Sequence, residues 1–121
     1  MLAQMQREEY VEAVLSLVEQ IPAGRVMSYG AIADWLGEGG PRQVGSVLSH
    51  HGGPVPWHRV VTAAGRPPVG NTVEALRRFR AEGTVLRGER VDMRVAAWYP
   101  PEFTSRSDPH DPSGTKVIQP S

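Results

Sequence analysis

Residues 6–20 carry an apolar stripe at helical spacing. Its members are Tyr10, Val14, Leu17 and Ile21, with Val11, Leu15 and Val18 beside them. Because steps of three and four residues return to the same face of an α-helix, the pattern predicts an amphipathic helix. Glutamates in its first turns favour the helix through the macrodipole, and the Pro-Ala-Gly segment 22–24 ends it. We expect this helix to support the fold.

Two shorter apolar patterns follow, and together they predict a helix-turn-helix. Ser28 is a favourable N-cap for a helix over 29–36, and Gly37 suits the position just past its end. After a glycine-rich loop, Pro41 suits the first position of a second helix that runs to about residue 50. Its inward positions are Val44, Val47 and Leu48. Such a pair of helices is typical of DNA-binding domains, although it also occurs elsewhere.

The outward side of this second helix is made of small residues. Gly45, Ser46 and Ser49 are small, and only Arg42 and Gln43, at its start, have long side chains. A helix that reads bases in the major groove normally presents several long polar side chains. The pattern instead favours close approach to another surface, with one arginine probing it.

The segment 55–61 is the most unusual part of the chain, since a large ring, an imidazole and a guanidinium stand side by side. Pro56 excludes a mid-helix position, whereas Val60 and Val61 favour a strand. Trp57 and His58 are therefore expected at a rigid bend that enters a short strand. Such a bend is a common way to point side chains into a pocket.

The rest of the chain predicts a loop at 64–71, a helix at about 73–82 and a short extended piece at 90–93. The helix is expected to bury Val73, Leu76 and Phe79 and to expose Arg77, Arg78 and Arg80. From Pro100 onward the composition predicts disorder. The expected division is therefore a DNA-binding domain at 1–99 and a disordered tail at 100–121.

Composition narrows the class of protein. The chain has 121 residues, enough for one domain, and it contains no cysteine. Disulfides, cysteine metal sites and thiol acceptors are therefore excluded.

The adjacent residues His50 and His51 are expected in a flexible loop, without the spacing of a zinc site. No cofactor or metal is expected. No apolar run is long enough for a membrane span, and no secretion signal opens the chain, so an intracellular (cytoplasmic) protein is expected. We also expect it to be a monomer.

Formal charge is balanced in total but not along the chain. Residues 1–24 have a net charge of −3, residues 25–94 one of +4 and residues 95–121 one of −1. All the positive charge of the middle segment comes from arginine, which suits phosphate contact and stacking on bases. A GC-rich genome also favours arginine over lysine, so the charge is a weak indication of nucleic-acid binding.

Four segments occur in the order found in the O6-alkylguanine-DNA alkyltransferases. They are 21–30, Pro41-Arg42-Gln43-Val44-Gly45, the Pro-x-His-Arg-Val-Val motif at 56–61, and the Glu82-Gly83 pair. Trp57 stands where that family has its nucleophilic cysteine. The chain thus resembles the alkyltransferase-like proteins, the non-enzymatic branch. The resemblance implies a mainly α, small winged-helix-like DNA-binding domain with a helix-turn-helix and short β segments.

The resemblance also implies residue roles on the DNA. Tyr29 matches the tyrosine that pushes on the 3′ phosphate and helps to rotate the nucleotide. Arg42 matches the arginine finger that fills the gap left by the flipped base. The family docks through the minor groove, in agreement with the small residues Gly45 and Ser46.

The predicted lesion pocket consists of Trp57, His58, Val60, Arg66 and Glu82, of which the resemblance implies Trp57, His58 and Glu82. His58 and Glu82 match a proton-relay pair whose hydrogen bond would favour the protonated imidazole. Trp57 is a poor nucleophile, so we expect no alkyl transfer, and its ring offers a flat wall for an alkylated guanine. Arg66 is a candidate contact to the base or its O6 substituent, and equally a solvated loop arginine.

Three functions remain open at this point. The first is a protein that flips O6-alkylguanine in double-stranded DNA without repairing it and marks it for nucleotide excision repair proteins. The alternative is a sequence-specific transcriptional regulator with a helix-turn-helix. The third is an enzyme that uses His58 and Glu82 on another substrate, which is the weakest because no serine stands beside His58. The preferred alkyl group does not follow from the sequence.

Overall fold

The computed structural model describes residues 6–101, so the predicted tail lies almost entirely outside the described residues. The elements in chain order are α1 (Arg7–Gln20), β1 (Met27–Ser28), α2 (Tyr29–Leu36), α3 (Pro41–His51), the 3-10 helix η2 (Trp57–Arg59), β2 (Val60–Val61), α4 (Thr72–Glu82), β3 (Leu86–Arg87), β4 (Arg90–Val91) and α5 (Met93–Ala96). Within 6–101, no helix is both long and apolar enough to span a bilayer. The chain is mainly helical with short strands, as predicted.

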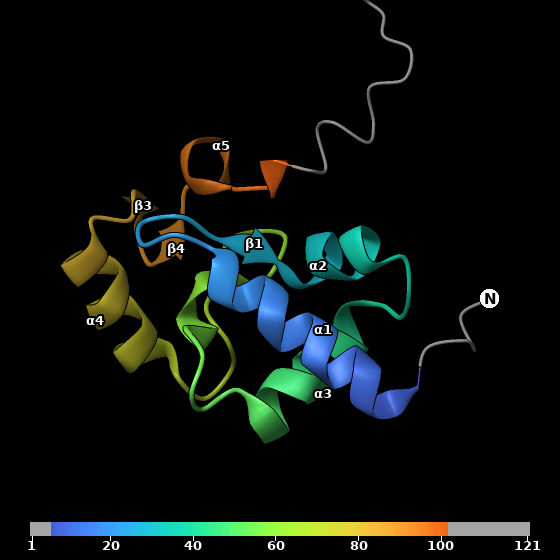
Figure 1. The fold of residues 1–121 in the computed structure, drawn as a ribbon. Coiled ribbons are helices and arrows are strands. Elements are labelled where there is room, and N and C mark those ends of the chain that lie inside the picture. The colour runs from blue at the N-terminus through green and yellow to red at the C-terminus, as the bar shows by residue number, and fades with distance from the viewer. Residues whose placement is uncertain (1–5, 102–121) are drawn as a thin grey trace, which may run out of the picture.

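The three N-terminal helices begin and end within a residue or so of their predicted positions. The Ser28 hydroxyl accepts a hydrogen bond from the Ala31 N–H at 3.0 Å, which caps α2. Gly37 ends α2 with a φ of 72°, a conformation that favours glycine. Pro41 occupies the first turn of α3, where its missing N–H costs no hydrogen bond. Helices α2 and α3 form the predicted helix-turn-helix, and α1 packs on both (Figure 1).

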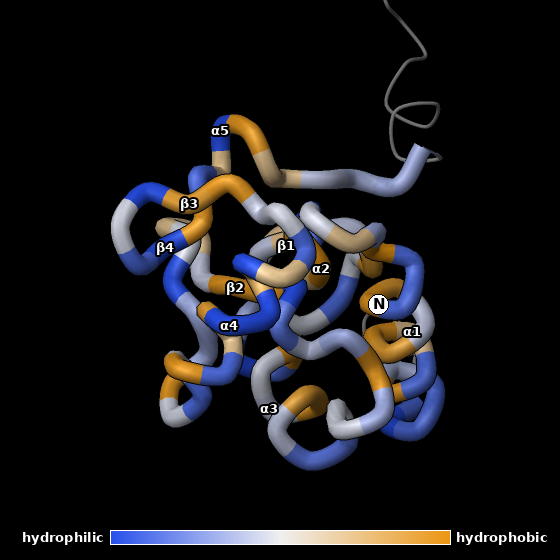
Figure 2. The backbone as a smooth tube through the Cα atoms, turned by 90° about the vertical axis from the view of Figure 1, so that its left-hand side faces the viewer, coloured by the Kyte–Doolittle hydropathy of each residue, from blue (hydrophilic) through white to orange (hydrophobic). Residues whose placement is uncertain are grey.

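The parallel pair β1–β2 separates two hydrophobic cores. Met27 pairs with Val60, and Ser28 with Val61. Since adjacent side chains of a strand point to opposite faces, Met27 and Val60 enter the first core, whereas Val26 and Val61 enter the second. All four apolar side chains are at most 1% exposed. The hydrophobic β2 segment lies near the middle of the molecule (Figure 2).

The first core is built by α1, α2 and α3, and the second lies under α4. Trp98 packs against the first core, as predicted. The second core consists of Val26, Val61, Ala75, Leu76, Phe79, Val91 and Ala96. In Figure 1 the three N-terminal helices occupy one side, and α4 with the β3–β4 hairpin occupies the other.

Two predictions about side-chain placement are wrong. Val73 is 83% exposed, because the first turn of α4 extends past the core, and the buried face is made by Ala75, Leu76 and Phe79. His50 and His51 do not lie in a loop, since α3 continues to His51. Valine and histidine are tolerated both inside and outside a core, so their type alone does not decide their position.

The extended piece predicted at 90–93 is shorter than expected. Arg90–Val91 pairs with Leu86–Arg87 as an antiparallel hairpin, and the chain then turns into α5. Asp92 caps α5 by accepting a hydrogen bond from the Arg94 N–H at 3.1 Å. An N-cap aspartate directly after the strand explains why the strand ends where it does.

Candidate nucleic-acid interface

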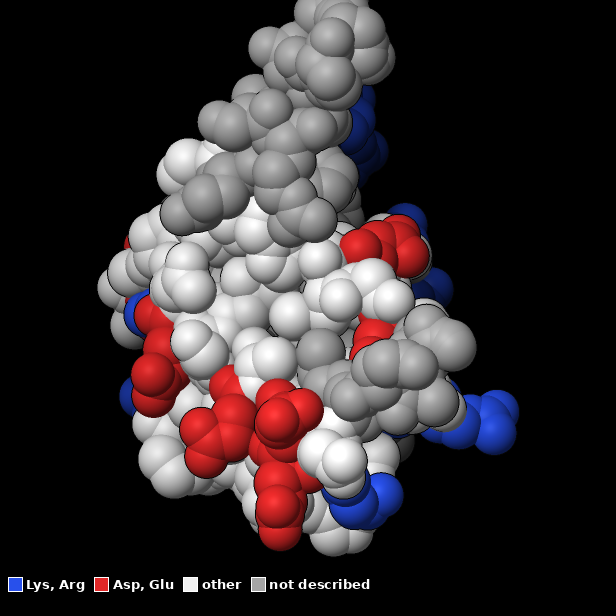
Figure 3. Space-filling model, turned by 45° about the vertical axis from the view of Figure 1, so that its right-hand side comes forward, with Lys and Arg blue, Asp and Glu red and all other residues white. Residues whose placement is uncertain are grey.

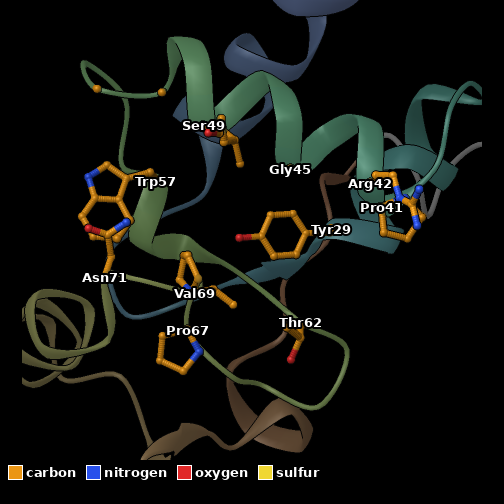
Figure 4. Close-up of a pocket in the computed structure, with 14 residues that line it drawn as sticks. Tyr29, Pro41, Arg42, Gly45, Ser49, Trp57, Thr62, Pro67, Val69 and Asn71 are labelled. Atoms are coloured by element: carbon orange, nitrogen blue, oxygen red, sulfur yellow. The ribbon is translucent and has the colours of Figure 1, made fainter.

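A cavity of about 740 Å³ opens between α3, the start of α2, η2 and the segment 62–71 (Figure 4). Of the predicted site residues, the structure brings Tyr29, Arg42, Gly45 and Trp57 together in its lining. Clefts of a few hundred cubic ångströms with apolar walls and a few polar groups are typical of small-ligand pockets. This cavity is therefore large enough for a planar base, and the residues that line it form the candidate site.

Helix α3 forms one wall with its small residues. Arg42, Gly45 and Ser49 recur at steps of three and four, so they share one helical face, and all three line the cavity. Ser49 was not predicted as a site residue, although its position four residues after Gly45 could have shown it. Ser46 faces a different hollow, which it shares with residues of α1. Its predicted role in DNA binding remains a prediction.

Tyr29 crosses the middle of the cavity from the first position of α2. Its hydroxyl points toward the end at which Trp57 lies, and Arg42 lies at the opposite end (Figure 4). Burial raises the pKa of the Tyr29 phenol above its ordinary value of 10.0. The hydroxyl therefore stays protonated at neutral pH and can donate a hydrogen bond to an anionic or polar group in the cavity.

Trp57 is half-buried and lines the cavity from the start of η2. The turn that carries it is closed by hydrogen bonds from the Trp57 N–H to the Val55 carbonyl (2.7 Å) and from the Arg59 N–H to the Pro56 carbonyl (2.9 Å). The Arg78 guanidinium carbon lies 5.2 Å from the centre of the indole ring, a cation–π distance. The predicted rigid bend is present and holds the ring beside the cavity.

His58 and Glu82 are hydrogen-bonded as predicted, with 2.8 Å between His58 Nε2 and the nearer carboxylate oxygen. The pair does not line the cavity. His58 is 3% exposed and lies behind Trp57, with its ring edge-on to the indole at a centroid distance of 5.9 Å. The pair thus supports the wall that Trp57 forms.

Arg59 is the important residue that sequence reasoning missed. Its Nη2 lies 2.7 Å and its Nε 3.1 Å from the two Glu82 oxygens, and its Nη1 donates to the Ile21 carbonyl at 2.8 Å. The Gly24 N–H also donates to Glu82, at 3.2 Å. Glu82 therefore joins η2, the end of α1 and α4. An arginine between an imidazole and a buried strand requires a carboxylate partner, which is the signal that could have revealed it.

The pKa of His58 moves opposite to the expectation from its hydrogen bond. Burial lowers it from 6.5, and the nearby Arg59 and Arg78 lower it further, which outweighs the effect of Glu82. His58 is therefore neutral at pH 7, with Nε2 donating to the carboxylate. Its Nδ1 is buried and has no partner within residues 6–101.

The pKa of Glu82 follows from competing causes. Burial alone would raise it, but hydrogen bonds from Arg59, His58 and the Gly24 N–H lower it from 4.5 to about 2. The carboxylate is charged at neutral pH, and Arg59 neutralises it. This group can orient side chains, but at neutral pH it is not a proton donor.

The remaining predicted pocket residues lie elsewhere. Val60 is fully buried in the first core, and Arg66 lines a neighbouring hollow instead of this cavity. Within the described part of the chain, no cluster of three His, Cys, Asp or Glu side chains could hold a metal ion. The cavity itself offers an aromatic face, small residues, a phenol and a guanidinium. This set can stack and hydrogen-bond a planar base, but it offers no nucleophile of the thiol type.

The chain is similar to known DNA-binding proteins. The family model described as "6-O-methylguanine DNA methyltransferase, DNA binding domain" matches residues 9–91. A DNA base-flipping protein of Escherichia coli (strain K12) is 35% identical over 103 residues, covering 78% of each chain. Alkyltransferase-like protein 1 of Schizosaccharomyces pombe is 41% identical over 67 residues, covering 50% of this chain and 59% of the relative.

The fold comparison agrees. The crystal structure of S. pombe Atl1 in complex with damaged DNA containing O6-carboxymethylguanine matches with a TM-score of 0.70 and 28% identity, over 79% of this chain and 100% of that one. A second S. pombe structure, of the same kind of protein with DNA, gives a TM-score of 0.67. Sequence and fold together show that this chain belongs to the 6-O-methylguanine DNA methyltransferase DNA-binding-domain family, in its alkyltransferase-like, base-flipping branch.

Proposed function

We propose that this protein binds double-stranded DNA containing O6-alkylguanine, rotates the modified nucleotide into the cavity beside Trp57 and holds it there without alkyl transfer. The observation that carries the proposal is the arrangement of the cavity, with Arg42 at one end, Trp57 at the other and the Tyr29 hydroxyl between them. The S. pombe relative was crystallised with DNA that carries an O6-carboxymethylguanine.

The proposed docking is through the minor groove. The face of α3 that lines the cavity has Gly45 and Ser49, which let the helix backbone approach DNA closely, and a single long side chain, Arg42. Arg42 enters the duplex and stacks in the gap that the extruded base leaves. Tyr29 pushes on the phosphate 3′ to the lesion. Extrusion costs a few kcal/mol, less for a base whose pairing is already weakened, so the mechanism favours damaged sites.

The alkyl group stays on the guanine because the cavity has no acceptor for it. The chain has no cysteine, and the nitrogen lone pair of the Trp57 indole belongs to the aromatic system. To test this, the protein is incubated with a duplex containing O6-methylguanine and examined by mass spectrometry. We expect neither a methylated protein nor restored guanine. The variant Trp57→Cys should also stay unmodified, because the segment 64–72 lacks the Tyr-Ser-Gly-Gly lid that the resemblance to the alkyltransferases implies for an active enzyme. A methylated thiol would contradict this.

Since the lesion is held and not converted, its removal requires other proteins. We therefore include in the proposal that the complex, formed by a monomer, marks the site for nucleotide excision repair proteins. The enzyme alternative has little support, because His58 is buried and its Nε2 is occupied by Glu82. The regulator alternative is opposed by the small residues of α3.

The test is a fluorescence titration of three duplexes of identical length. The first sample carries O6-methylguanine, and the second has guanine at that position. The third sample is a pool of duplexes with random sequences. Tighter binding to the modified duplex supports the proposal. Equal affinity for the modified and unmodified duplexes contradicts lesion recognition, and selection of one sequence from the pool supports a regulator instead.

A further inference from the structure

A second hollow, of about 480 Å³, adjoins the base cavity and is lined by arginines. Arg66, Arg87 and Arg90 line it together with one acidic residue, Glu89, which leaves a net charge of +2 at neutral pH. The two hollows share Pro67 and Val69, so that these residues form the rim between them. The position of the hollow therefore depends on the same loop that borders the base cavity.

The three arginines come from segments that are far apart in the sequence. Arg66 follows β2, whereas Arg87 and Arg90 belong to the β3–β4 hairpin. The loop reaches the hairpin at Gly65, whose carbonyl accepts a hydrogen bond from the Val91 N–H at 2.9 Å. Gly65 has a φ of 87°, and a Cβ there would lie 2.3 Å from the Val91 carbonyl oxygen. Only glycine permits this close approach, which brings the guanidinium groups to one hollow.

The arrangement is unfavourable for the free protein. Arg87 and Arg90 are directly paired across the hairpin, and like charges in that position repel each other. Within residues 6–101, none of the three guanidinium groups forms an ion pair, although Arg77 and Arg78 on the neighbouring helix α4 both bind Glu74. Three guanidinium groups without ion-pair partners in residues 6–101, around a hollow of net charge +2, match an anion, and guanidinium groups bind phosphate with particular strength.

We propose that Arg66, Arg87 and Arg90 clamp backbone phosphates of the duplex beside the extruded nucleotide. The inference rests on the proposed function, because it takes the adjoining cavity to be where the base enters. The hollow lies on the other side of the rim formed by Pro67 and Val69, so a strand that leaves the cavity over this rim passes the three arginines. For this reason DNA, rather than an acidic protein segment, is the partner that the position favours.

The charge distribution agrees with this orientation of the duplex. Helix α1 carries the exposed acidic residues Glu8, Glu9, Glu12 and Glu19, and it lines neither the base cavity nor the arginine-lined hollow. Acidic side chains gather on the face of the molecule shown in Figure 3. A duplex is repelled from that face and attracted to the arginine-lined one.

Phosphate contacts carry no information about the base, which gives the clamp a distinctive signature. Losing them weakens binding to modified and unmodified DNA by the same factor and reduces the salt dependence of binding, by about one unit of the log–log slope for each phosphate contact. Losing a contact to the lesion itself would instead reduce only the preference for modified DNA.

The test uses the full chain with Arg66, Arg87 and Arg90 each changed to glutamine, singly and together. Dissociation constants for duplexes with guanine and with O6-methylguanine are measured between low and physiological salt. We expect the slope of log affinity against log salt concentration to fall by about two to three units in the triple variant, which is about one unit for each lost phosphate contact. The ratio of the affinities for the two duplexes should stay unchanged. The control is Arg80→Gln, which removes one exposed charge from α4 outside both hollows.

The possible outcomes separate the clamp from the proposed function. A triple variant with the slope of the control overturns the clamp and would point to a different anionic partner. A fall in the affinity ratio at Arg66→Gln with an unchanged slope also overturns it, because Arg66 would then contact the lesion. A wild-type protein without preference for the modified duplex overturns the proposed function, whatever the slopes of the variants. Unchanged thermal unfolding of each variant shows that the folds are comparable.

Discussion

The two cores of this small domain are held together in different ways. The first core is formed by α1, α2 and α3, whose apolar faces pack against one another. The second core depends on segments that are distant in the sequence. Val26 exchanges backbone hydrogen bonds with Ala96 and Trp98. Glu82, at the end of α4, binds Arg59. Packing between helix faces stabilises most of the first region, whereas charged and backbone contacts between remote segments add to the apolar packing of the second.

The base cavity lies at the boundary between these regions. Tyr29 packs on the first core and Arg42 begins α3, whereas Trp57 packs on the second core. Neither region contains the site by itself. The comparison teaches that the geometry of the site depends on the contacts that hold the two regions in register, and the following predictions test this dependence.

Among changes at the residues that join the two regions or line the site, Glu82→Gln is expected to have the largest effect, which is a loss of stability. The change removes a charge that Arg59 and His58 bind, and it leaves the half-buried Arg59 guanidinium without its counterion. Breaking such a pair costs about 3 kcal/mol of the free energy of unfolding. The matched control is Glu74→Gln, on the same helix and also bound by two side chains but more exposed, which we expect to cost much less. Urea unfolding measures both. Equal losses would show that the two regions are not joined by Glu82.

The second prediction concerns Arg42→Ala. Arg42 is exposed and belongs to neither core, so the fold should be unaffected. Binding to a duplex with O6-methylguanine should weaken about tenfold or more, because the gap left by the extruded base is no longer filled and extrusion costs a few kcal/mol. Arg42→Lys keeps the charge but not the planar group and should recover binding only in part. Unchanged affinity in the alanine variant would refute the finger assignment.

The third prediction concerns Trp57→Ala, which removes the flat wall of the cavity. Stacking between an aromatic side chain and a base contributes about 1 to 3 kcal/mol, so lesion binding should weaken by about one order of magnitude. Trp57→Phe keeps a smaller ring and should lose less. Competition titrations with modified and unmodified duplexes measure the effect. The assignment fails if the alanine variant keeps the full preference for the modified duplex.

The fourth prediction is a loss of stability in acid, in two stages. The folded protein keeps the pKa of His58 below 6.5, so this contribution is complete above that pH and is lost as the pH falls below it. The pKa of Glu82 is about 2 in the fold and 4.5 without its partners, so its contribution is lost between about pH 5 and pH 2. Urea midpoints from pH 7.5 to 3 record both stages. In Glu82→Gln the lower stage should become smaller; a stage of unchanged size would assign it to other carboxylates, such as Glu74, whose pKa Arg77 and Arg78 also lower to about 2.

The smallest expected effect is that of Val73→Ala. Because the side chain is 83% exposed, the free energy of unfolding should change by less than about 0.5 kcal/mol. Leu76→Ala, three residues later on the same helix, is the comparison and should cost about 2 to 5 kcal/mol, since Leu76 is 6% exposed in the second core. Thermal unfolding distinguishes them. A large loss at Val73 would restore the placement predicted from the sequence.

The first region was predictable because its signals are local. The cap at Ser28, the proline at Pro41 and the helical spacing of the apolar residues act within a few positions, and α1, α2 and α3 have nearly the predicted bounds. The motif segments also singled out Tyr29, Arg42 and Trp57, which the structure brings to one cavity. Their roles on DNA stay predictions. A resemblance of ordered motifs carries information about contacts that periodicity alone does not contain.

The second region was less predictable, because its contacts join positions tens of residues apart. The sequence determined the helices, the bend at Trp57 and the absence of a thiol, since these depend on the intrinsic preferences of each residue and its neighbours. Only the tertiary structure decided that Arg59 binds Glu82, that burial keeps His58 neutral and that Arg66 lies with the hairpin arginines. Burial and long-range charge pairing arise only when remote segments pack, and no local pattern records which segments those are.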